Sequence, residues 1–485
     1  DKNDFVLTID GETVVLSSPF PTSISKSGNS YTLGIGSRGD PTGVENLTVL
    51  LVENSIFDAA GNAANMTQTL RTVKFNDKDA PSIAALTLSN DNKILTVVMS
   101  EKVYSGSDGT GLIDSTAFNL VINDGTAQLL SQYPSSLKYV DSTATFELGL
   151  PLKLIADGTE KLTLGFQANA MYDASGTVAA TTQKINKVTL FDLSAPVITE
   201  SKLNSDNKKV AVRFSVPVYA DAKANLTLEE DDFRLSLVGG TATLKSTTPS
   251  SIDSSDNGKR FELGIDVVGV PDGREVLTIN PVDNNIYDNS ANPANKVQTN
   301  NSMNLNDKQP PVIADVKLST SNDTLFVTLS EAAYAKSNGT DTLLVAAFNL
   351  AITNGQSRLT NSKPKSITGN GNTYALTFDL SGIPDGREEL SVIPDANQVF
   401  DAAGNAASTV QKNNTVYLND QKAPKAPQGL VAIPGNLQAT ISWRASGETD
   451  ISKYYIYGGT TVNPTTVMDS VNYGSNTKIL LGLTN

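Results

Sequence analysis

The chain consists of short stretches in which every second residue is apolar, separated by clusters of Gly, Asn, Asp and Ser. Alternation with a period of two predicts half-buried β-strands, and the intervening residue types favour turns. No segment shows the sustained 3.6-residue periodicity of a helix. We therefore predict an all-β fold. The clearest series of expected strands covers residues 83–88, 94–100, 118–122, 144–150, 161–164 and 187–191.

This series recurs along the chain together with an acidic motif, which occurs at residues 56–62, 172–177, 287–292 and 400–405. The motif aspartates Asp58, Asp173, Asp288 and Asp401 follow each other in steps of 115, 115 and 113 residues. A proline keeps the same spacing at positions 81, 196, 311 and 424. A fixed period of this kind indicates tandem domains.

About seven short strands per 110 residues suit a two-sheet β-sandwich of immunoglobulin type. Prolines at the head of each unit would stiffen the connections, so we predict tandem Ig-like β-sandwich domains in an extended array. The first residues match the middle of later repeats, which suggests that repeat 1 lacks its opening strands. The expected units are repeat 1 (1–78), repeat 2 (79–194), repeat 3 (195–309), repeat 4 (310–422) and an incomplete C-terminal module (423–485).

Composition narrows the possible chemistry. The 485 residues include neither histidine nor cysteine, which excludes Ser-His-Asp and Cys-His nucleophile systems, thiolate metal sites and disulfides. The formal charge of −14 makes nucleic acid an unfavourable partner, and no apolar run is long enough for a membrane span. Paired carboxylates could serve a glycosidase, but we interpret the candidates, residues 229–232 and the pair Glu388 and Glu389, as solvated strand ends.

Two resemblances extend this interpretation. Residues 439–443, with the only tryptophan, and 454–457, with alternate tyrosines, make the C-terminal module resemble part of a fibronectin type III module. Residues 79–81, 100–103 and 401–405 carry a resemblance to the bacterial Ig-like repeats of S-layer proteins and large surface adhesins. This second resemblance spans roughly residues 1–422. It implies secretion and a surface role, and it implies no enzymatic activity.

The predicted topology places the acidic motif at the junctions between repeats. In an Ig-type sandwich, the loop after strand two and the loop before the last strand share the pole that faces the preceding domain. Carboxylates gathered there would repel each other unless a cation lay among them, and calcium prefers such hard oxygen ligands. The candidate ligands are Asp77, Asp79, Glu101 and Asp173 at the first junction, Asp192, Asp288 and Asn292 at the second, and Asp307, Glu331, Asp401 and Asn405 at the third.

The second junction has Ser215, Val216 and Pro217 where the others have a Ser-Glu pair, so we expect it to bind calcium weakly or not at all. An alternative stays open at this point: Asp, Asn and Gly are ordinary turn residues, and the motif aspartate could simply cap backbone N–H groups.

The resulting prediction is a non-enzymatic structural or spacer segment of a large bacterial cell-surface or secreted protein, stiffened by calcium at its junctions. Its expected partners are neighbouring domains of the same longer chain, and other surface proteins or glycans reached through regions outside it. The alternative is the spacer region of a secreted polysaccharide-degrading enzyme. Glycan binding by a repeat itself would require a face of exposed aromatic residues, whereas Phe118, Phe233 and Phe348 occupy strand positions expected in the core.

Overall fold

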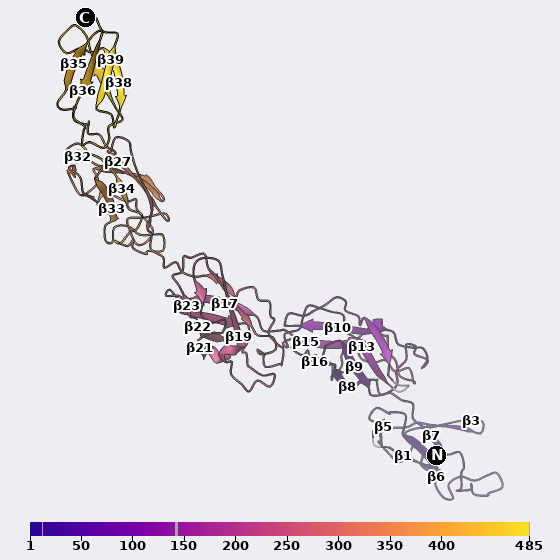
Figure 1. Ribbon diagram of the computed structural model, residues 1–485. Coiled ribbons are helices and arrows are strands. Elements are labelled where there is room, and N and C mark those ends of the chain that lie inside the picture. The colour runs from indigo at the N-terminus through magenta and orange to yellow at the C-terminus, as the bar shows by residue number, and fades with distance from the viewer. Residues whose placement is uncertain (12, 141–143, 485) are drawn as a thin grey trace.

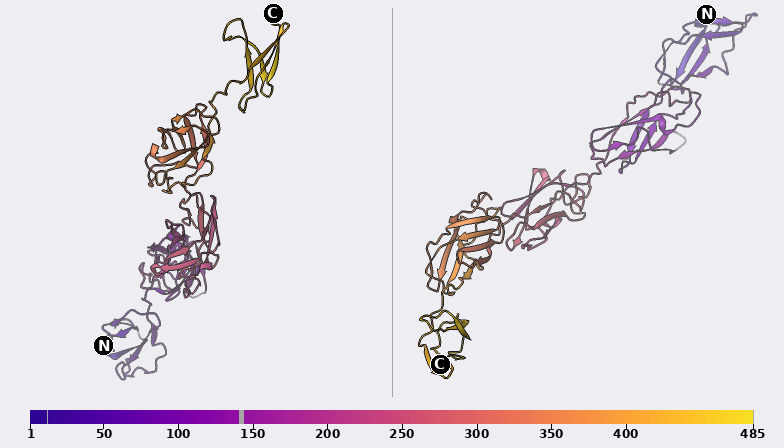
Figure 2. Two further views of the ribbon diagram at one scale, coloured as in Figure 1. Left: turned by 60° about the vertical axis from the view of Figure 1, so that its left-hand side comes forward. Right: turned by 90° about the horizontal axis from the view of Figure 1, so that it is seen from above.

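The computed structural model describes residues 1–11, 13–140 and 144–484 as a row of five small β domains. The two termini lie at opposite ends of the row, and the two further views show the same extended shape (Figures 1 and 2). Every hydrogen-bonded sheet uses strands from one predicted unit only. The tandem, all-β prediction for the fold is confirmed.

Helical structure in the described residues is limited to single 3-10 turns, namely η1 (Lys2–Asp4), η2 (Ser115–Ala117), η3 (Glu230–Asp232), η4 (Asp256–Gly258) and η5 (Val345–Ala347). None of the helices in this part of the chain is long and apolar enough to cross a membrane.

Repeat 2 shows the complete arrangement, in which two antiparallel sheets enclose the core. The larger sheet has the order β12 (Ser136–Tyr139), β13 (Thr145–Gly149), β9 (Ile94–Met99) and β8 (Ile83–Leu88). The smaller sheet has the order β10 (Phe118–Asn123), β15 (Lys161–Phe166) and β16 (Lys187–Thr189). A short pair, β11 (Gln128–Leu129) and β14 (Leu152–Lys153), adjoins them.

Alternation along these strands produces the core. Phe118 on β10 is fully buried, and its ring lies 5.7 Å from that of Phe146 on β13 in an edge-to-face contact between the two sheets. Edge-to-face aromatic pairs add to the stabilisation that apolar burial provides. The corresponding Phe233 and Phe348 are also fully buried, so the prediction that these three phenylalanines belong to the core is confirmed.

Repeats 3 and 4 reproduce this arrangement. Repeat 3 contains β17 (Ile198–Leu203), β18 (Lys209–Phe214), β22 (Arg260–Gly264) and β21 (Ser251–Ser255), then β19 (Phe233–Val238), β24 (Val276–Pro281) and β25 (Ser302–Asn304), and the pair β20 (Thr243–Leu244) and β23 (Val267–Val268). Repeat 4 contains β26 (Ile313–Leu318), β27 (Thr324–Leu329), β31 (Thr373–Thr377) and β30 (Ser366–Asn370), then β28 (Phe348–Thr353), β33 (Glu389–Pro394) and β34 (Thr415–Tyr417), and the pair β29 (Arg358–Leu359) and β32 (Leu380–Ser381).

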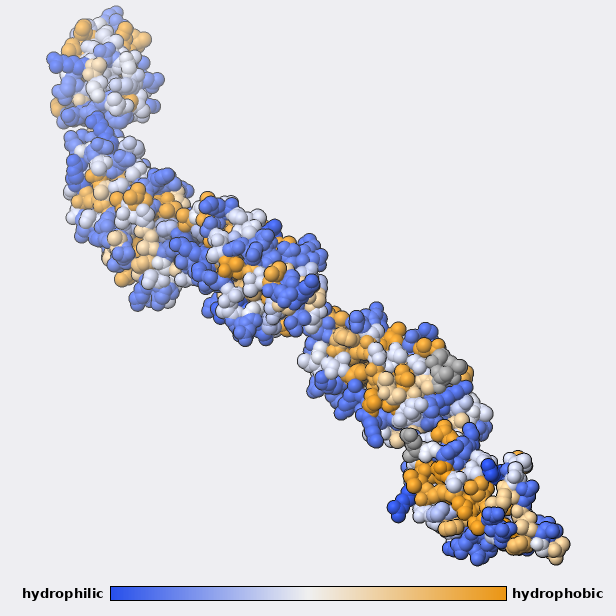
Figure 3. Space-filling view, turned by 90° about the horizontal axis from the view of Figure 1, so that it is seen from below, coloured by the Kyte–Doolittle hydropathy of each residue, from blue (hydrophilic) through white to orange (hydrophobic). Residues whose placement is uncertain are grey.

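Repeat 1 differs in its larger sheet. Its strands are β1 (Phe5–Asp10), β6 (Asn46–Leu51) and β7 (Thr72–Lys74), the pair β2 (Val15–Leu16) and β5 (Ser37–Arg38), and the hairpin β3 (Ile24–Ser27) and β4 (Ser30–Leu33). No other described strand pairs with this hairpin, and Tyr31 on β4 is 48% exposed, whereas Phe146 at the same place in repeat 2 is 1% exposed. Apolar residues accordingly gather on the surface of repeat 1 (Figure 3).

The C-terminal module has a separate, smaller core around Trp443 and Tyr454, whose rings lie 5.2 Å apart. Its strands are β35 (Val431–Gly435), β36 (Gln438–Ser442) and β39 (Thr477–Leu481) in one sheet, and β37 (Lys453–Tyr457) and β38 (Val467–Asn472) in another.

A buried asparagine in the first turn of each complete repeat holds the segment that leaves the repeat. The Asn92 side chain donates to Phe191 O at 2.7 Å and accepts from Phe191 N–H at 2.8 Å. Asn207 and Asn322 make the same two bonds to Asn306 and Asn419. Residue 191 directly precedes the linker aspartate Asp192, so this pairing fixes where each linker begins.

Candidate functional site at the repeat junctions

A backbone bridge brings together the two loops that the topology predicted at one pole. Tyr104 N–H donates to Tyr172 O at 2.7 Å, and Tyr172 N–H donates back to Tyr104 O at 2.9 Å. The same bridge joins Tyr219 to Tyr287 and Tyr334 to Phe400. Tyr104, Tyr219 and Tyr334 therefore pair with the acidic motif of their own repeat. The bridge places the loop containing Glu101 beside the loop containing Asp173.

Within the acidic motif, one carboxylate oxygen of the aspartate closes its own loop. Asp173 Oδ1 accepts the N–H groups of Ser175 at 2.8 Å and Thr177 at 2.7 Å, and Gly176 permits the turn with a φ of +84°. Asp288 and Asp401 likewise accept the N–H groups of Asn292 and Asn405. The capping role that we considered as an alternative is therefore present. It uses Oδ1 and leaves Oδ2 for other partners.

The linker aspartate is held against the end of the preceding repeat. Asp77 Oδ1 accepts Asp79 N–H at 3.0 Å, and Lys78 N–H donates to Pro41 O at 2.7 Å. Gly43 lies so close that a Cβ there would come within 3.2 Å of Asp77 Cβ. Asp307 has equivalent contacts with Gln309 N–H and Gly273. The preceding repeat thus sets the position of one carboxylate in each junction.

At the first junction these elements gather three carboxylates. Asp77, Glu101 and Asp173 each offer an oxygen, and the three oxygens lie within 4.8 Å of one another. Burial, together with the charges of Asp77, Asp173 and Asp79, raises the pKa of Glu101 to about 7. Asp79 contributes charge, but it does not belong to the three-residue group. Three acids this close repel each other strongly when all are ionised.

The third junction repeats this geometry with Asp307, Glu331 and Asp401, whose oxygens also lie within 4.8 Å of one another. Burial, then the charges of Asp401 and Asp307, raise the pKa of Glu331 to about 7. One difference is that Asn405 Nδ2 donates to Asp401 Oδ2 at 2.7 Å and to Asp307 O at 3.2 Å. Asn405 therefore lies at the junction and donates hydrogen bonds across it.

Among the described residues, the second junction brings together two of these acids, Asp192 and Asp288. Burial raises the pKa of Asp192, and the charge of Asp288 raises it further. Asn292 Nδ2 donates to Asp288 Oδ2 at 2.9 Å and to Asp192 O at 3.2 Å, as Asn405 does at the third junction. Val216 stands where the other two junctions have a glutamate. Weak or absent calcium binding at this junction stays a prediction.

Sequence reasoning missed a buried glutamate that supports each junction from the preceding repeat. Glu45, Glu160, Glu275 and Glu388 are all fully buried. Glu388 accepts the N–H groups of Gln356 and Ser357, both at 2.9 Å, and of Asp385 at 3.0 Å. Burial raises the pKa of this carboxyl, but the backbone N–H donors outweigh burial and hold its pKa at about 2.

These glutamates tie together the two turns at the end of each repeat that faces the next one. Their spacing of 115, 115 and 113 residues was a signal that could have revealed them. Our interpretation of Glu388 as part of a solvated strand end was wrong. It was also wrong for Asp232, which is 5% exposed and accepts Glu229 N–H at 2.8 Å. A carboxylate can be buried when backbone N–H groups replace the water it loses, and such donors are present at both Glu388 and Asp232.

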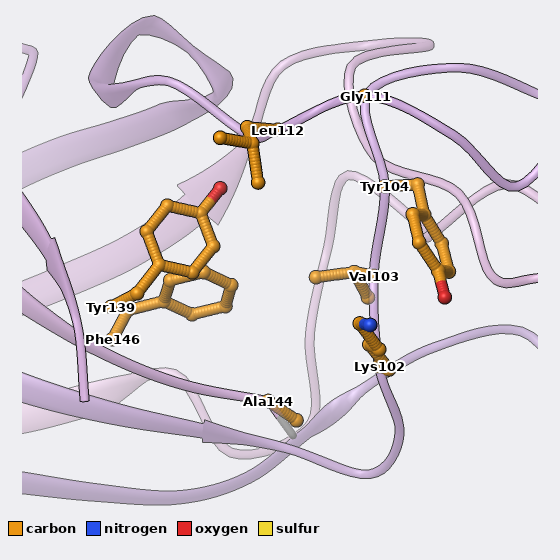
Figure 4. Close-up of a pocket in the computed structure, with 8 residues that line it drawn as sticks. All are labelled: Lys102, Val103, Tyr104, Gly111, Leu112, Tyr139, Ala144 and Phe146. Atoms are coloured by element: carbon orange, nitrogen blue, oxygen red, sulfur yellow. The ribbon is translucent and has the colours of Figure 1, made fainter. Parts of the chain in front are cut away.

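Repeat 2 also contains an apolar pocket of about 540 Å³ next to the loop that carries Glu101. Tyr139 and Phe146 lie on one side of it and Val103 and Lys102 on the other (Figure 4). The Tyr139 hydroxyl donates to Ile113 O at 2.8 Å, so its polar end is already paired. This aromatic pair belongs to the sandwich and does not form a flat platform for a sugar ring.

Comparisons with known proteins add little to this geometry. No protein-family model and no curated protein sequence matches the chain. Among solved structures, the FN1–FN3 domains of chicken CNTN1 match at 10% identity over 60% of this chain and 88% of that one, with a TM-score of 0.22. The S-layer protein SbsC matches at 12% identity over 84% of this chain and 64% of that chain, with a TM-score of 0.18. Scores this low carry no argument about function.

Proposed function

We propose that this chain is a non-enzymatic structural segment of a bacterial surface or secreted protein, which spaces or assembles other parts of that protein. The extended row of small sandwiches supports a spacing role, since repeats 2 to 4 and the C-terminal module each have their own core and join their neighbours through short linkers. The motif resemblance to Ig-like repeats of S-layer proteins and adhesins supports an extracellular address. An adhesin stalk, a surface fibre and a surface lattice all fit this role.

The spacer region of a secreted polysaccharide-degrading enzyme is the second candidate. The C-terminal module favours it, because its Trp443 and Tyr454 core follows the fibronectin-like pattern found in the sequence.

We further propose that calcium stiffens the first and third junctions. The observation that carries this proposal is the first junction, where Asp173 is fully buried and its Oδ2 has no hydrogen-bond partner within the described residues. A buried carboxylate oxygen without a partner is costly, and the neighbouring oxygens of Asp77 and Glu101 offer it no proton donor when ionised. A calcium ion would satisfy all three, and it accepts carboxylates and backbone carbonyls in flexible geometry.

Such an ion would be held jointly by two repeats, since Asp77 belongs to the linker after repeat 1 whereas Glu101 and Asp173 belong to repeat 2. Binding would therefore oppose bending at the junction as well as unfolding of repeat 2. The stabilisation follows mass action and amounts to about 2.7 kcal/mol at a free calcium concentration of 100 Kd.

Scanning calorimetry of the full chain in calcium, in magnesium and in chelator tests this proposal. We expect calcium to raise the unfolding temperature, and magnesium to do so less because it demands a tighter octahedral shell. The double variant Glu101→Gln with Glu331→Gln should lose most of the calcium effect, while the exposed Glu200→Gln serves as the matched control. Equal unfolding temperatures of the unmodified chain in calcium and in chelator would refute calcium binding.

A further inference from the structure

The acidic motif varies at several positions between the three junctions, and the position four residues after its aspartate is the one whose side chain reaches the linker in repeats 3 and 4. This position is Thr177 in repeat 2, Asn292 in repeat 3 and Asn405 in repeat 4. The difference decides what fills the space between the motif aspartate and the linker.

In repeats 3 and 4 an amide group fills that space. Asn405 Nδ2 lies 2.7 Å from Asp401 Oδ2 and 3.2 Å from the linker oxygen Asp307 O, and it donates to both. Asn292 Nδ2 joins Asp288 Oδ2 to Asp192 O at 2.9 and 3.2 Å. The –NH2 group of an amide carries two donors, so a single side chain can satisfy one acceptor from each repeat.

In repeat 2 the corresponding side chain leaves Asp173 Oδ2 unsatisfied. Thr177 has one hydroxyl and no amide, and within the described residues Asp173 Oδ2 has no partner although the residue is fully buried. Asp77 and Glu101 each place a carboxylate oxygen within 4.8 Å of an oxygen of Asp173, and both are acceptors when ionised. Buried polar atoms in native proteins are nearly always paired, so this oxygen points to a ligand.

We propose that the residue four positions after the motif aspartate determines whether a junction depends on calcium. Asparagine at this position bridges the two repeats with its own amide group, whereas threonine leaves the bridge to a calcium ion. This inference rests on the calcium binding proposed above and ranks the three junctions by their calcium affinity. The first junction binds calcium most tightly. The third junction binds it more weakly, because the ion must compete with the Asn405 amide for Asp401 Oδ2. The second junction, with two acids and an amide bridge, does not need it.

The junctions along the array would then differ in how much their rigidity depends on calcium. The second joint would be held by direct hydrogen bonds at any calcium concentration, and the third by direct hydrogen bonds until calcium displaces the Asn405 amide from Asp401 Oδ2. The first joint would become rigid only when calcium is present. Displacing a hydrogen bond to a charged group weakens a competing ligand by about tenfold or more, which sets the expected difference between the first and third junctions.

Titration calorimetry of the full chain with calcium chloride can measure each junction separately. Glu331→Gln removes one acid from the third junction, so calcium binding to this variant reflects mainly the first junction. Glu101→Gln removes one acid from the first junction, so calcium binding to that variant reflects mainly the third. We expect Kd to be at least about tenfold lower in the Glu331→Gln background. Adding Thr177→Asn to that background should weaken binding about tenfold or more, and adding Asn405→Thr to the Glu101→Gln background should strengthen it.

A second readout separates loss of calcium binding from loss of folding. In chelator, Thr177→Asn should unfold at the same or a higher temperature than its parent, because the new amide gives Asp173 Oδ2 a partner. The control is Asn62→Thr, which changes the same position in repeat 1, where Asn62 also donates to the motif aspartate Asp58 at 2.9 Å. No three-acid group includes Asp58 among the described residues, so Asn62→Thr should leave calcium affinity unchanged.

The outcomes distinguish this inference from the proposal beneath it. Absence of calcium binding in both backgrounds would overturn calcium binding and this inference together. Binding with equal affinity at the two junctions, unaffected by Thr177→Asn, would overturn the inference and leave the proposed calcium sites standing. Lower stability of Thr177→Asn in chelator would also overturn it, since the amide would then not be replacing an ion.

Discussion

Replacing Glu388 by glutamine tests whether a buried carboxylate holds the end of repeat 4 together. The carboxylate is fully buried and accepts three backbone N–H groups from two separate turns. Its pKa is about 2 in the folded chain against an ordinary value of 4.5, and one pKa unit corresponds to about 1.4 kcal/mol. The charged form therefore contributes roughly 3 kcal/mol at neutral pH. Glu388→Gln places an –NH2 group against backbone donors and should lose about 2 to 3 kcal/mol.

Hydrogen exchange with mass spectrometry reads this loss locally, without requiring the whole array to unfold in one step. We expect the amides of Gln356, Ser357 and Asp385 to exchange about 30-fold faster or more in Glu388→Gln. The neighbouring Glu389→Gln is the matched control, because Glu389 is only half-buried, and its effect should stay within about threefold. Equal exchange in the two variants would show that the carboxylate does not hold these turns.

The same pKa shift predicts how the stability of this end of repeat 4 changes with pH. A carboxyl whose pKa is lowered by folding stabilises the chain above its unfolded value, and this contribution disappears as the pH falls from about 4.5 through about 2. In Glu388→Gln this acid-induced acceleration of exchange should be absent from the same amides.

Three further predictions concern the junctions. In chelator, unfolding temperature should fall as pH rises from about 4.5 through about 7, because folding raises the pKa of Glu101 and Glu331, and calcium should suppress this loss. Val216→Glu should destabilise the second junction in chelator by on the order of 1 to 3 kcal/mol, and calcium should restore part of that; no difference between the two conditions would argue against the charge-cluster reasoning. Asn92→Ala should destabilise repeat 2 by about 1 to 3 kcal/mol in urea denaturation, because it removes both bonds to Phe191, while the exposed Asn90→Ala should be nearly neutral.

The fold was predictable because it depends on two patterns visible in the sequence, the alternation of apolar residues within each strand and the spacing of the repeats. Alternating strands and the 115-residue step predicted both the sandwiches and their tandem order, and the topology predicted that Glu101 and Asp173 would lie at one pole. The position of Asp77 in the linker before repeat 2 likewise predicted that it would lie near these two acids. Asp79, four residues before the first core strand, was predicted among the ligands but lies outside the three-acid group.

What escaped prediction depends on contacts between loops distant in the sequence. Glu388 looks solvated from its charged surroundings, and only the closure of the turns at 356–357 and 385 buries it. Thr177 reads as an ordinary turn residue, and its importance emerges only when the partner of Asp173 Oδ2 is sought. The pattern of hydrophobic residues does not reveal such hydrogen bonds, so the roles of these positions became visible only in the structure.

Small-angle X-ray scattering of the full chain in calcium and in chelator tests the central claim most directly, with the Glu101→Gln and Glu331→Gln double variant as reference. If calcium bridges neighbouring repeats, the unmodified chain should be longer and less variable in shape in calcium than in chelator, and the double variant should behave alike in both. Identical scattering from the unmodified chain in calcium and in chelator would contradict an array whose junctions calcium stiffens.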